Sequence, residues 1–292
     1  MRFRTGLSRL FRLGGSIPTS VKPTSTQAHR YFYLGPELAL VKTRSGHLVY
    51  VDPLDEHVSA NIIAHGYWEA WVHKVVMDLL RPGDRVVEIG ANVGYYTVTM
   101  ADRIGPTGFQ VALEANPRMA SLIQRSAQIN GFTNRLRLIC KAAMNESGEI
   151  DFVISRRNSG GGYVSFWDHQ PYEDGEKLRV EAVRLDDLEL GSANFIRIDA
   201  EGSEAFILYG AAELLQRSPD VVICMEWSVL QISSRTSVPD FIGWMTGQGF
   251  MFWKIGYSGE LSLLAPEALA DLPNCDIVAC RNDQRTQVLV TG

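Results

Sequence analysis

Residues 84–97 read DRVVEIGANVGYYT, and this stretch decides the fold of the chain. A short run rich in β-branched residues ends on Glu88. Two glycines, Gly90 and Gly94, follow before a segment that can be helical. The pattern is typical of a buried parallel strand, a tight glycine turn and a helix N-terminus. Such a turn lets a ligand approach the backbone closely, because glycine has no Cβ and tolerates positive φ.

The residues around this turn indicate which ligand it holds. A phosphate-binding loop needs a lysine after its last glycine, and none follows Gly94. A dinucleotide turn needs a second glycine where this chain has Asn92. Glu88 would repel a phosphate and favours a cationic ligand. S-adenosylmethionine fits, since it carries an ammonium and a sulfonium and no phosphate. A plain strand–turn–helix without a cofactor is the alternative.

A second motif, FQVALEANP at residues 109–117, supports an adenosyl ligand. In nucleotide-binding α/β folds, an acidic residue about 20 positions after the glycine turn binds the ribose hydroxyls. Glu114 lies 20 residues after Gly94. The two motifs together predict S-adenosylmethionine ahead of NAD.

Acidic residues also end two later strands. Residues 195–204 read FIRIDAEGSE, so Asp199 and Glu201 follow an apolar strand, and the strand at 221–226 ends on Glu226. Ligands of open α/β sheets bind outside the carboxyl ends of the strands, where the cofactor motifs also lie. Acids packed together raise the pKa of at least one of them, which proteins tolerate for catalysis or for a cation. We predict that these three residues are catalytic.

Several runs together resemble the FkbM-type S-adenosylmethionine-dependent methyltransferases. The runs are EIGANVGYYT (88–97), LEANP (113–117), VRLDDL (183–188) and IRIDAEGSEAFILYGA (196–211). The resemblance covers roughly residues 69–226, and the D-x-E-G-x-E run is its most specific part. It implies methyl transfer to a hydroxyl, typically on a sugar, glycolipid, polysaccharide or polyketide-type natural product. Arg197 stands where this motif commonly has a lysine.

The resemblance also identifies cofactor residues on this chain. The positions that match its cofactor motif are Glu88, Gly90, Asn92, Gly94 and Glu114. We further expect these residues to surround the cofactor: Glu69, Thr97, Ala115, Asn116, Ala143 and Asp199.

The acids leave two ways to activate an acceptor hydroxyl. A carboxylate at Asp199 or Glu201 can take the proton as a general base. Alternatively, Asp199 and Glu226 can hold Mg²⁺, which acidifies a bound hydroxyl. The sequence leaves both open.

The order of strands and helices predicts the fold class. We predict an α/β protein with a doubly wound, mostly parallel, seven-stranded Rossmann-like methyltransferase sheet and an antiparallel C-terminal strand. Residues 81–292 form this S-adenosylmethionine-binding domain. Residues 31–80 form a small N-terminal cap with a β-hairpin and a helix. The polar, glycine-rich stretch 156–177 is too long for a simple connection and is expected to face the acceptor, with a surface insertion as the alternative.

Residues 1–30 are a basic tail, in which Arg2, Arg4, Arg9 and Arg12 alternate with apolar residues. A basic amphipathic helix that contacts a membrane surface or a partner is one interpretation, and a loosely ordered tail is the plainer one.

Composition narrows the class of protein. The chain of 292 residues is 46% hydrophobic and 21% charged, with a formal net charge of −5, which is ordinary for a globular protein. It lacks the basic footprint of nucleic-acid binding, and no apolar run approaches the ~20 residues of a membrane span. The four cysteines form no metal or redox motif, which predicts a reducing, cytoplasmic location.

These observations predict an O-methyltransferase that acts on a hydroxyl of a small-molecule sugar, glycan or natural-product acceptor by in-line transfer. Three alternatives stay open: methylation of an amine, an NAD-dependent oxidoreductase on the same fold, and a non-catalytic binding protein with a methyltransferase core. The missing G-x-G-x-x-G weighs against the oxidoreductase. The intact cofactor and acidic motifs weigh against the non-catalytic protein.

Overall fold

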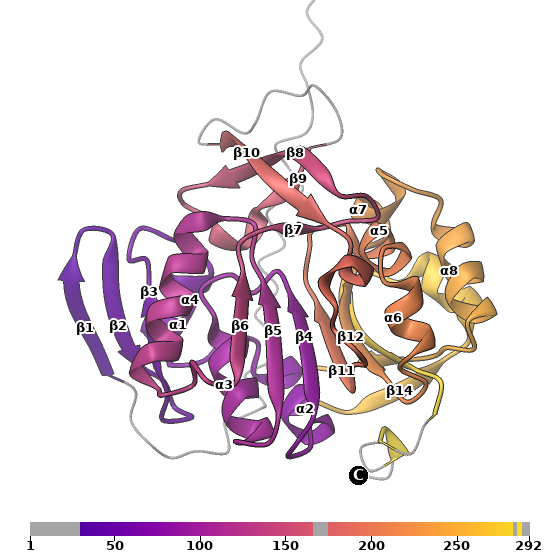
Figure 1. Cartoon of the computed structure of the whole chain (residues 1–292), viewed down its shortest axis with the longest axis horizontal. Helices are drawn as coiled ribbons and strands as arrows, with labels where there is room; N and C mark the ends of the chain where they lie inside the picture. Colours follow the sequence, from indigo (N-terminus) through magenta and orange to yellow (C-terminus); the bar gives the residue numbers. More distant parts are fainter. Residues whose placement is uncertain (1–29, 166–174, 283–284, 288–292) are drawn as a thin grey trace, which may run out of the picture.

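A computed structural model describes residues 30–165, 175–282 and 285–287 of the chain (Figure 1). The tail predicted for residues 1–30 lies outside this part, apart from Arg30. Within the described residues, no helix has both the length and the apolar character needed to cross a bilayer.

The centre of the molecule is an eight-stranded sheet in the order β14-β13-β15-β12-β11-β4-β5-β6. Neighbours from β12 to β6 run parallel, and β15, β13 and β14 are antiparallel. The strands are β4 (Arg85–Ile89), β5 (Phe109–Leu113), β6 (Leu136–Ile139), β11 (Phe195–Ile198), β12 (Val222–Trp227), β13 (Met251–Ile255), β14 (Leu261–Leu264) and β15 (Cys275–Cys280). The predicted Rossmann-like α/β class is confirmed. The sheet has one strand more than the seven expected, because β14 pairs with β13 and extends the antiparallel end.

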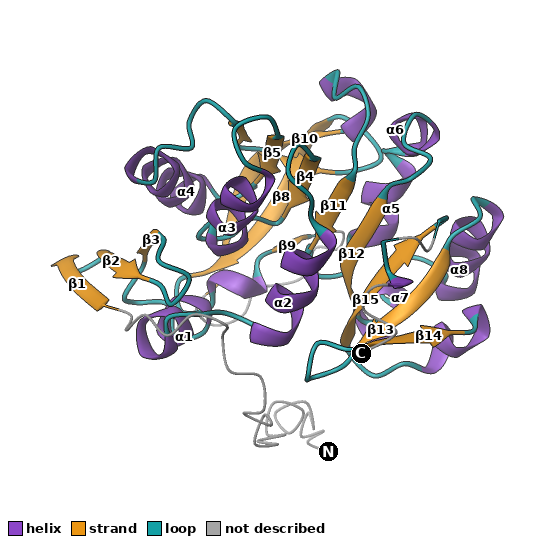
Figure 2. Ribbon diagram, turned by 90° about the horizontal axis from the view of Figure 1, so that it is seen from below, coloured by secondary structure: helices purple, strands orange, loops and turns teal. Residues whose placement is uncertain are grey.

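Alternate residues of the central strands enter two separate cores, so helices must cover both faces of the sheet (Figure 2). In β4, Val86 belongs to one core and Val87 to the other, as expected for side chains with a period of two. One face carries α2 (Ala70–Leu79), α3 (Tyr95–Ile104) and α4 (Pro117–Ile129). The other carries α5 (Glu204–Tyr209), α6 (Ala212–Gln216), α7 (Val229–Ser233) and α8 (Val238–Gly247). This is the predicted doubly wound arrangement.

The residues before the central sheet form a three-stranded antiparallel sheet and a helix. The strands are β1 (Arg30–Gly35), β2 (Leu38–Lys42) and β3 (Leu48–Val51), and the helix is α1 (Val58–His65). The predicted hairpin corresponds to β2 and β3, whereas β1 and α1 were not expected. Leu48 and Tyr50 donate backbone hydrogen bonds to side chains of α4 and its C-terminus, at 3.0 and 2.9 Å. The small sheet is therefore attached directly to the main fold.

A third sheet, inserted between β6 and β11, lies beyond the carboxyl ends of the central strands (Figure 1). It contains β7 (Ala142–Ala143), β8 (Gly148–Ser155), β9 (Tyr163–Val164) and β10 (Gly175–Val183). Much of the glycine-rich stretch 156–177 therefore joins strands of this sheet. Residues 166–174, which include His169, lie outside the described residues.

Candidate functional site

A cavity of about 280 Å³ lies at the carboxyl ends of the central strands. Ten of the residues that the sequence predicts around the cofactor or the chemistry line it. These are Glu69, Gly90, Asn92, Glu114, Ala115, Asn116, Ala143, Asp199, Glu201 and Glu226. The cofactor motifs and the acidic motif thus meet in one cavity, as the parallel strand order predicts.

The turn after β4 brings the backbones of two motifs into contact. Gly90 has a φ of 75°, and a Cβ placed on it would lie 1.7 Å from the carbonyl oxygen of Asp199. The Asp199 amide donates to the Ile89 carbonyl at 3.1 Å. Asn92 also adopts a left-handed conformation, with a φ of 52°, which asparagine tolerates better than most residues. Only glycine fits at position 90, because any side chain would displace the end of β11.

Glu114 closes the cofactor side of the cavity with both of its carboxylate oxygens. One oxygen accepts the Asn92 amide at 2.7 Å and the other accepts the Asn116 amide at 2.8 Å. Burial raises the pKa of Glu114 to about 7, and the two backbone hydrogen bonds oppose this rise. The carboxylate is held in one orientation toward the cavity, where it suits ribose hydroxyls.

Glu88, Gly94 and Thr97 do not line the cavity, so their positions do not support the direct cofactor contact expected for them. Glu88 is fully buried and accepts hydrogen bonds from Thr97 Oγ1 at 2.7 Å and Gln110 Nε2 at 2.8 Å. A Cβ on Gly94 would lie 3.0 Å from Ile123 of α4, so this glycine allows α3 to pack closely. The three residues therefore stabilise the turn from outside the cavity.

Arg197 is a buried cation at the centre of the site, which the sequence indicated only as a motif position. Its Nη2 lies 3.0 Å from Asp199 Oδ2 and 3.8 Å from Glu69 Oε2, and the side chain is 5% exposed. The guanidinium stacks over Tyr96, 3.8 Å from the ring centroid, and the Tyr96 hydroxyl donates to Glu69 Oε2 at 3.4 Å. The network joins β11, α3 and the residue before α2.

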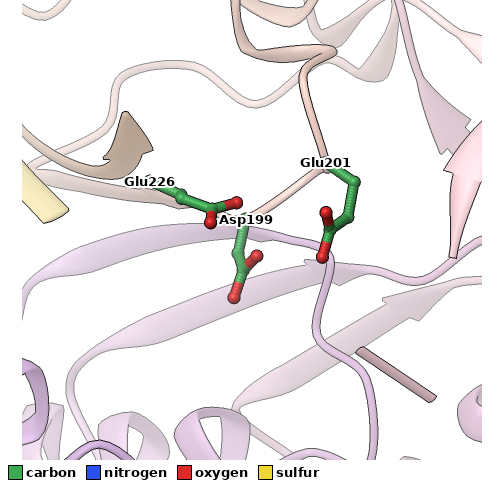
Figure 3. Close-up of side chains that lie close together, drawn as sticks. All are labelled: Asp199, Glu201 and Glu226. Atoms are coloured by element: carbon green, nitrogen blue, oxygen red, sulfur yellow. The ribbon is translucent and has the colours of Figure 1, made fainter. Parts of the chain in front are cut away.

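Asp199, Glu201 and Glu226 lie together, as Figure 3 shows, with one carboxylate oxygen of each within 4.8 Å of the others. Gln231 Nε2 donates to Glu201 Oε2, and Asn274 Nδ2 donates to Glu226 Oε1 at 3.1 Å. The second oxygen of Glu226 is buried and has no hydrogen-bond partner among the described residues.

Burial, followed by the negative charge of Asp199, raises the pKa of Glu201 to about 8 and that of Glu226 to about 10. In the absence of a cation, both glutamates therefore bind protons near neutral pH. Oxygen atoms from three carboxylates are the ligands that Mg²⁺ prefers, so the donor set fits the predicted ion. Any cation here would release these protons, because it favours the charged form of both glutamates.

Asp276 is a further acid of the cavity that the sequence did not single out. It lies in β15 directly opposite Glu226 of β12. Burial and the charge of Asp199 raise the pKa of Asp276 to about 7, although Arg197 opposes the rise. The sequence feature that could have identified Asp276 is its position as an acid near the start of an otherwise apolar strand. Together with Glu69, it gives the cavity more acidic than basic groups and favours a cationic ligand.

Hydrogen bonds between the segment that contains Asp55 and the segment that contains Ser159 border the cavity on the side of the N-terminal residues. The buried carboxylate of Asp55 accepts hydrogen bonds from the Ser59 amide at 2.6 Å, the Ser159 amide at 3.1 Å and the Ser159 hydroxyl at 2.8 Å. Ser159 and its neighbours Asn158 and Gly160 line the cavity. Part of the glycine-rich stretch therefore does face the cavity.

Comparisons with known proteins find similarity to methyltransferases. The chain is similar to the protein-L-isoaspartate O-methyltransferase of Hyperthermus butylicus, with 28% identity over 145 residues, 46% of this chain and 54% of that protein. The enzyme of the same description from Methanococcus aeolicus is 30% identical over 82 residues, 27% of this chain and 38% of that protein. The chain thus spans about half or less of the length of these curated relatives.

Two solved structures have a similar fold. The FkbM methyltransferase from Methylobacillus flagellatus matches 67% of this chain and 43% of its own, with a TM-score of 0.44 and 12% identity. The O-methyltransferase TomG from Streptomyces achromogenes, solved in complex with S-adenosylmethionine, matches 72% of this chain and 78% of its own, with a TM-score of 0.42 and 13% identity.

A family model decides the assignment. The model described as the methyltransferase FkbM domain matches residues 88–252, which is more than half of the chain. This range contains the glycine turn, Glu114 and the three clustered acids. The chain therefore belongs to the family of the FkbM methyltransferase domain.

Proposed function

We propose that the protein is an O-methyltransferase whose acceptor is a hydroxyl of a sugar, glycan or natural product. The observation that carries the proposal is the backbone contact between Gly90 and Asp199. This contact supports the proposal because it holds Asp199, whose carboxylate could activate a hydroxyl, next to the glycine turn that would bind the cofactor. The cofactor supplies a methyl group on a cationic sulfur, so no further activation of the leaving group is needed.

The residues of the chain have two tasks in this reaction. Glu114 and the turn from Gly90 to Asn92 bind and orient the adenosyl group, which brings the acceptor oxygen, methyl carbon and sulfur into line. One acid of the cluster takes the hydroxyl proton as the carbon–oxygen bond forms and the carbon–sulfur bond breaks. The products are a methyl ether, S-adenosylhomocysteine and a protonated carboxylate.

The acid-lined cavity favours a neutral or cationic acceptor. The relatives named above are O-methyltransferases, which supports oxygen as the accepting atom. A carboxylate acceptor would be repelled by Asp199 and its neighbours, whereas a hydroxyl would not. We therefore propose a hydroxyl as the acceptor group, in preference to a carboxylate or an amine.

Mg²⁺ is the alternative to a carboxylate base. Asp199 and Glu226, with Glu201 beside them, would hold the ion, and the unpartnered oxygen of Glu226 supports this assignment. The ion would then lower the pKa of the acceptor hydroxyl. Mg²⁺ binding in calorimetry, with proton release that is lost in Glu226→Gln, would favour the metal. Full activity in EDTA would favour the base.

Calorimetry with S-adenosylhomocysteine, with NAD as the parallel ligand, tests the cofactor site. Incubation with methyl-labelled S-adenosylmethionine and a panel of sugars, glycans, phenols and amines then tests the acceptor, with the methylated atom located by mass spectrometry. We expect a methyl ether as product, and loss of turnover in Asp199→Asn. Asp220→Asn is the matched control, since Asp220 precedes β12 at its opposite end. A product methylated on nitrogen or carbon would contradict O-methylation.

A further inference from the structure

The strand β1 lies at one end of the molecule (Figures 1 and 2) and exposes a series of apolar side chains. Among the described residues, it is the outermost strand of its sheet and pairs with β2 alone. The exposed fractions of four consecutive residues are 41% for Tyr31, 45% for Phe32, 61% for Tyr33 and 51% for Leu34. Both faces of β1 are therefore uncovered, because consecutive strand residues point to opposite sides.

No other described part of the chain has this feature. The remaining large exposed hydrophobic residues are isolated, at Leu54, Phe109, Ile129, Leu230, Met251, Tyr257 and Leu263. Single exposed apolar residues are normal, whereas a contiguous group marks an interaction surface. The neighbouring strand β2 alternates between buried and partly buried residues, as a strand that covers a core should.

The residues that precede β1 in the sequence are positively charged, whereas the rest of the protein is negatively charged. Residues 1–30 contain six basic residues, Arg2, Arg4, Arg9, Arg12, Lys22 and Arg30, and no acidic residue. The other residues then carry 22 basic and 33 acidic side chains, a net charge of −11. The basic residues directly precede the exposed strand in the sequence. An anionic surface would attract this segment and repel the body of the protein.

A bilayer fits these two observations better than a partner strand does. A strand that paired with the free edge of β1 would satisfy its backbone but leave aromatic side chains exposed on both faces. Headgroups and acyl chains would surround both faces at once. Tyrosine, phenylalanine and leucine suit the membrane interface, and arginines bind lipid phosphates.

We propose that the exposed strand β1 docks the protein on a membrane surface that contains anionic lipid, with the side chains of Tyr31, Phe32, Tyr33 and Leu34 in the headgroup region. The positive charge of the residues that precede β1 in the sequence would favour this surface. The turn after β1 lies close to the cavity. Glu37, in the turn after β1, borders a second pocket, which shares Asn116, Ile154, Ser155 and Ser159 with the main cavity. A membrane-bound acceptor would meet the cavity from this side, and this last clause alone rests on the proposed function.

Vesicle flotation of the full chain tests the proposal without an acceptor or cofactor. We expect binding to vesicles of phosphatidylcholine mixed with phosphatidylglycerol, and binding at least about tenfold weaker to phosphatidylcholine alone or at high salt. The combined variant Arg2→Gln, Arg4→Gln, Arg9→Gln and Arg12→Gln should lose most of the binding. The combined variant Tyr31→Ser, Phe32→Ser and Tyr33→Ser should weaken it severalfold.

Two matched controls separate docking from general surface effects. Tyr257→Ser with Leu263→Ser removes exposed apolar groups elsewhere, and Arg156→Gln with Arg157→Gln removes exposed charge. Both should bind vesicles like the unmodified protein. Unchanged thermal unfolding of every variant shows that the fold is intact.

Three results would overturn the proposal. The first is absence of binding to the anionic vesicles. The second is an equal loss of vesicle binding in the two control variants. The third is vesicle binding that the β1 variant does not alter. Light scattering of the vesicle-free protein identifies a second copy as the occupant if a dimer becomes a monomer in the β1 variant. Because none of these measurements involves methyl transfer, their outcome is independent of the proposed function.

Discussion

The two pairs of strand ends that form the cavity differ in how their acids are held. At the ends of β4 and β5, Glu88 and Glu114 accept two hydrogen bonds each from the chain itself. At the ends of β11 and β12, Glu226 has one exposed amide as partner and a buried oxygen without one. Both oxygens of Glu114 are satisfied by the fold, whereas Glu88 keeps a buried oxygen without a partner among the described residues, outside the cavity lining. The second pair leaves acidic groups for an acceptor or a cation to complete.

The backbone contact between the two pairs should be the most sensitive point of the molecule. In Gly90→Ala the new Cβ would collide with the Asp199 carbonyl, so we expect a loss of at least about 4 kcal/mol in the free energy of unfolding. Gly131→Ala is the matched control, since Gly131 has the same φ of 75° and open space around its Cβ position. It should lose only about 1–2 kcal/mol, from backbone strain. Urea unfolding measures both, and equal losses would contradict the contact.

The buried acid of the first pair should make stability depend on pH. Burial raises the pKa of Glu88 to about 7 from a usual value of 4.5, so folding favours its protonated form. Glu88 contributes fully to the free energy of unfolding below about pH 4.5. As pH rises toward 7 this contribution is lost, which lowers the free energy of unfolding by on the order of 3 kcal/mol.

Glu88→Gln should therefore show a smaller fall in the free energy of unfolding between pH 5 and pH 8 than the unmodified protein. Glu213→Gln, on the surface of α6, is the control and should leave the fall unchanged. A pH profile of Glu88→Gln that parallels the unmodified protein would exclude Glu88 as its source.

Exchange of one acid in each pair should separate binding from chemistry. Glu114→Gln places an amide donor against a backbone N–H, so we expect a loss of about 1–3 kcal/mol in stability and weaker S-adenosylhomocysteine binding. Glu226→Gln mimics the protonated glutamate expected at neutral pH, so stability and S-adenosylhomocysteine binding should hold. Mg²⁺ binding, which needs the ionised carboxylate, and any methyl transfer that depends on the ion should be lost. Calorimetry and thermal unfolding measure both variants. The comparison fails if Glu226→Gln weakens S-adenosylhomocysteine binding as much as Glu114→Gln does.

The smallest effect is expected at the partner of Glu226. Asn274→Ala removes an exposed hydrogen bond to Glu226 Oε1, so stability should change by less than about 0.5 kcal/mol. Methyl transfer should decrease modestly, because the glutamate loses its orienting donor. A larger loss of stability would mean that Glu226 is held as firmly as Glu114.

The sequence predicted the ends of the central strands well, because a strand-end acid followed by glycine is a local pattern. It could not show which face Glu88 occupies, since a shift of one residue reverses the face of a strand. The stacking of Arg197 on Tyr96 joins positions about 100 residues apart and leaves no local pattern. Asp276 reaches the cavity only because β15 pairs antiparallel with β12. The strand β14 was missed because its short sequence alternates weakly.

The contact of Gly90 with the Asp199 carbonyl also limits how such an enzyme can diversify. The contact joins backbone to backbone, so peptide geometry sets the spacing between the glycine turn and the acids. No side-chain replacement can adjust this spacing. The loops around Ser159 carry no such restriction. New acceptors would therefore be acquired by rebuilding the loops, while the offset between the donor turn and the acids is inherited unchanged.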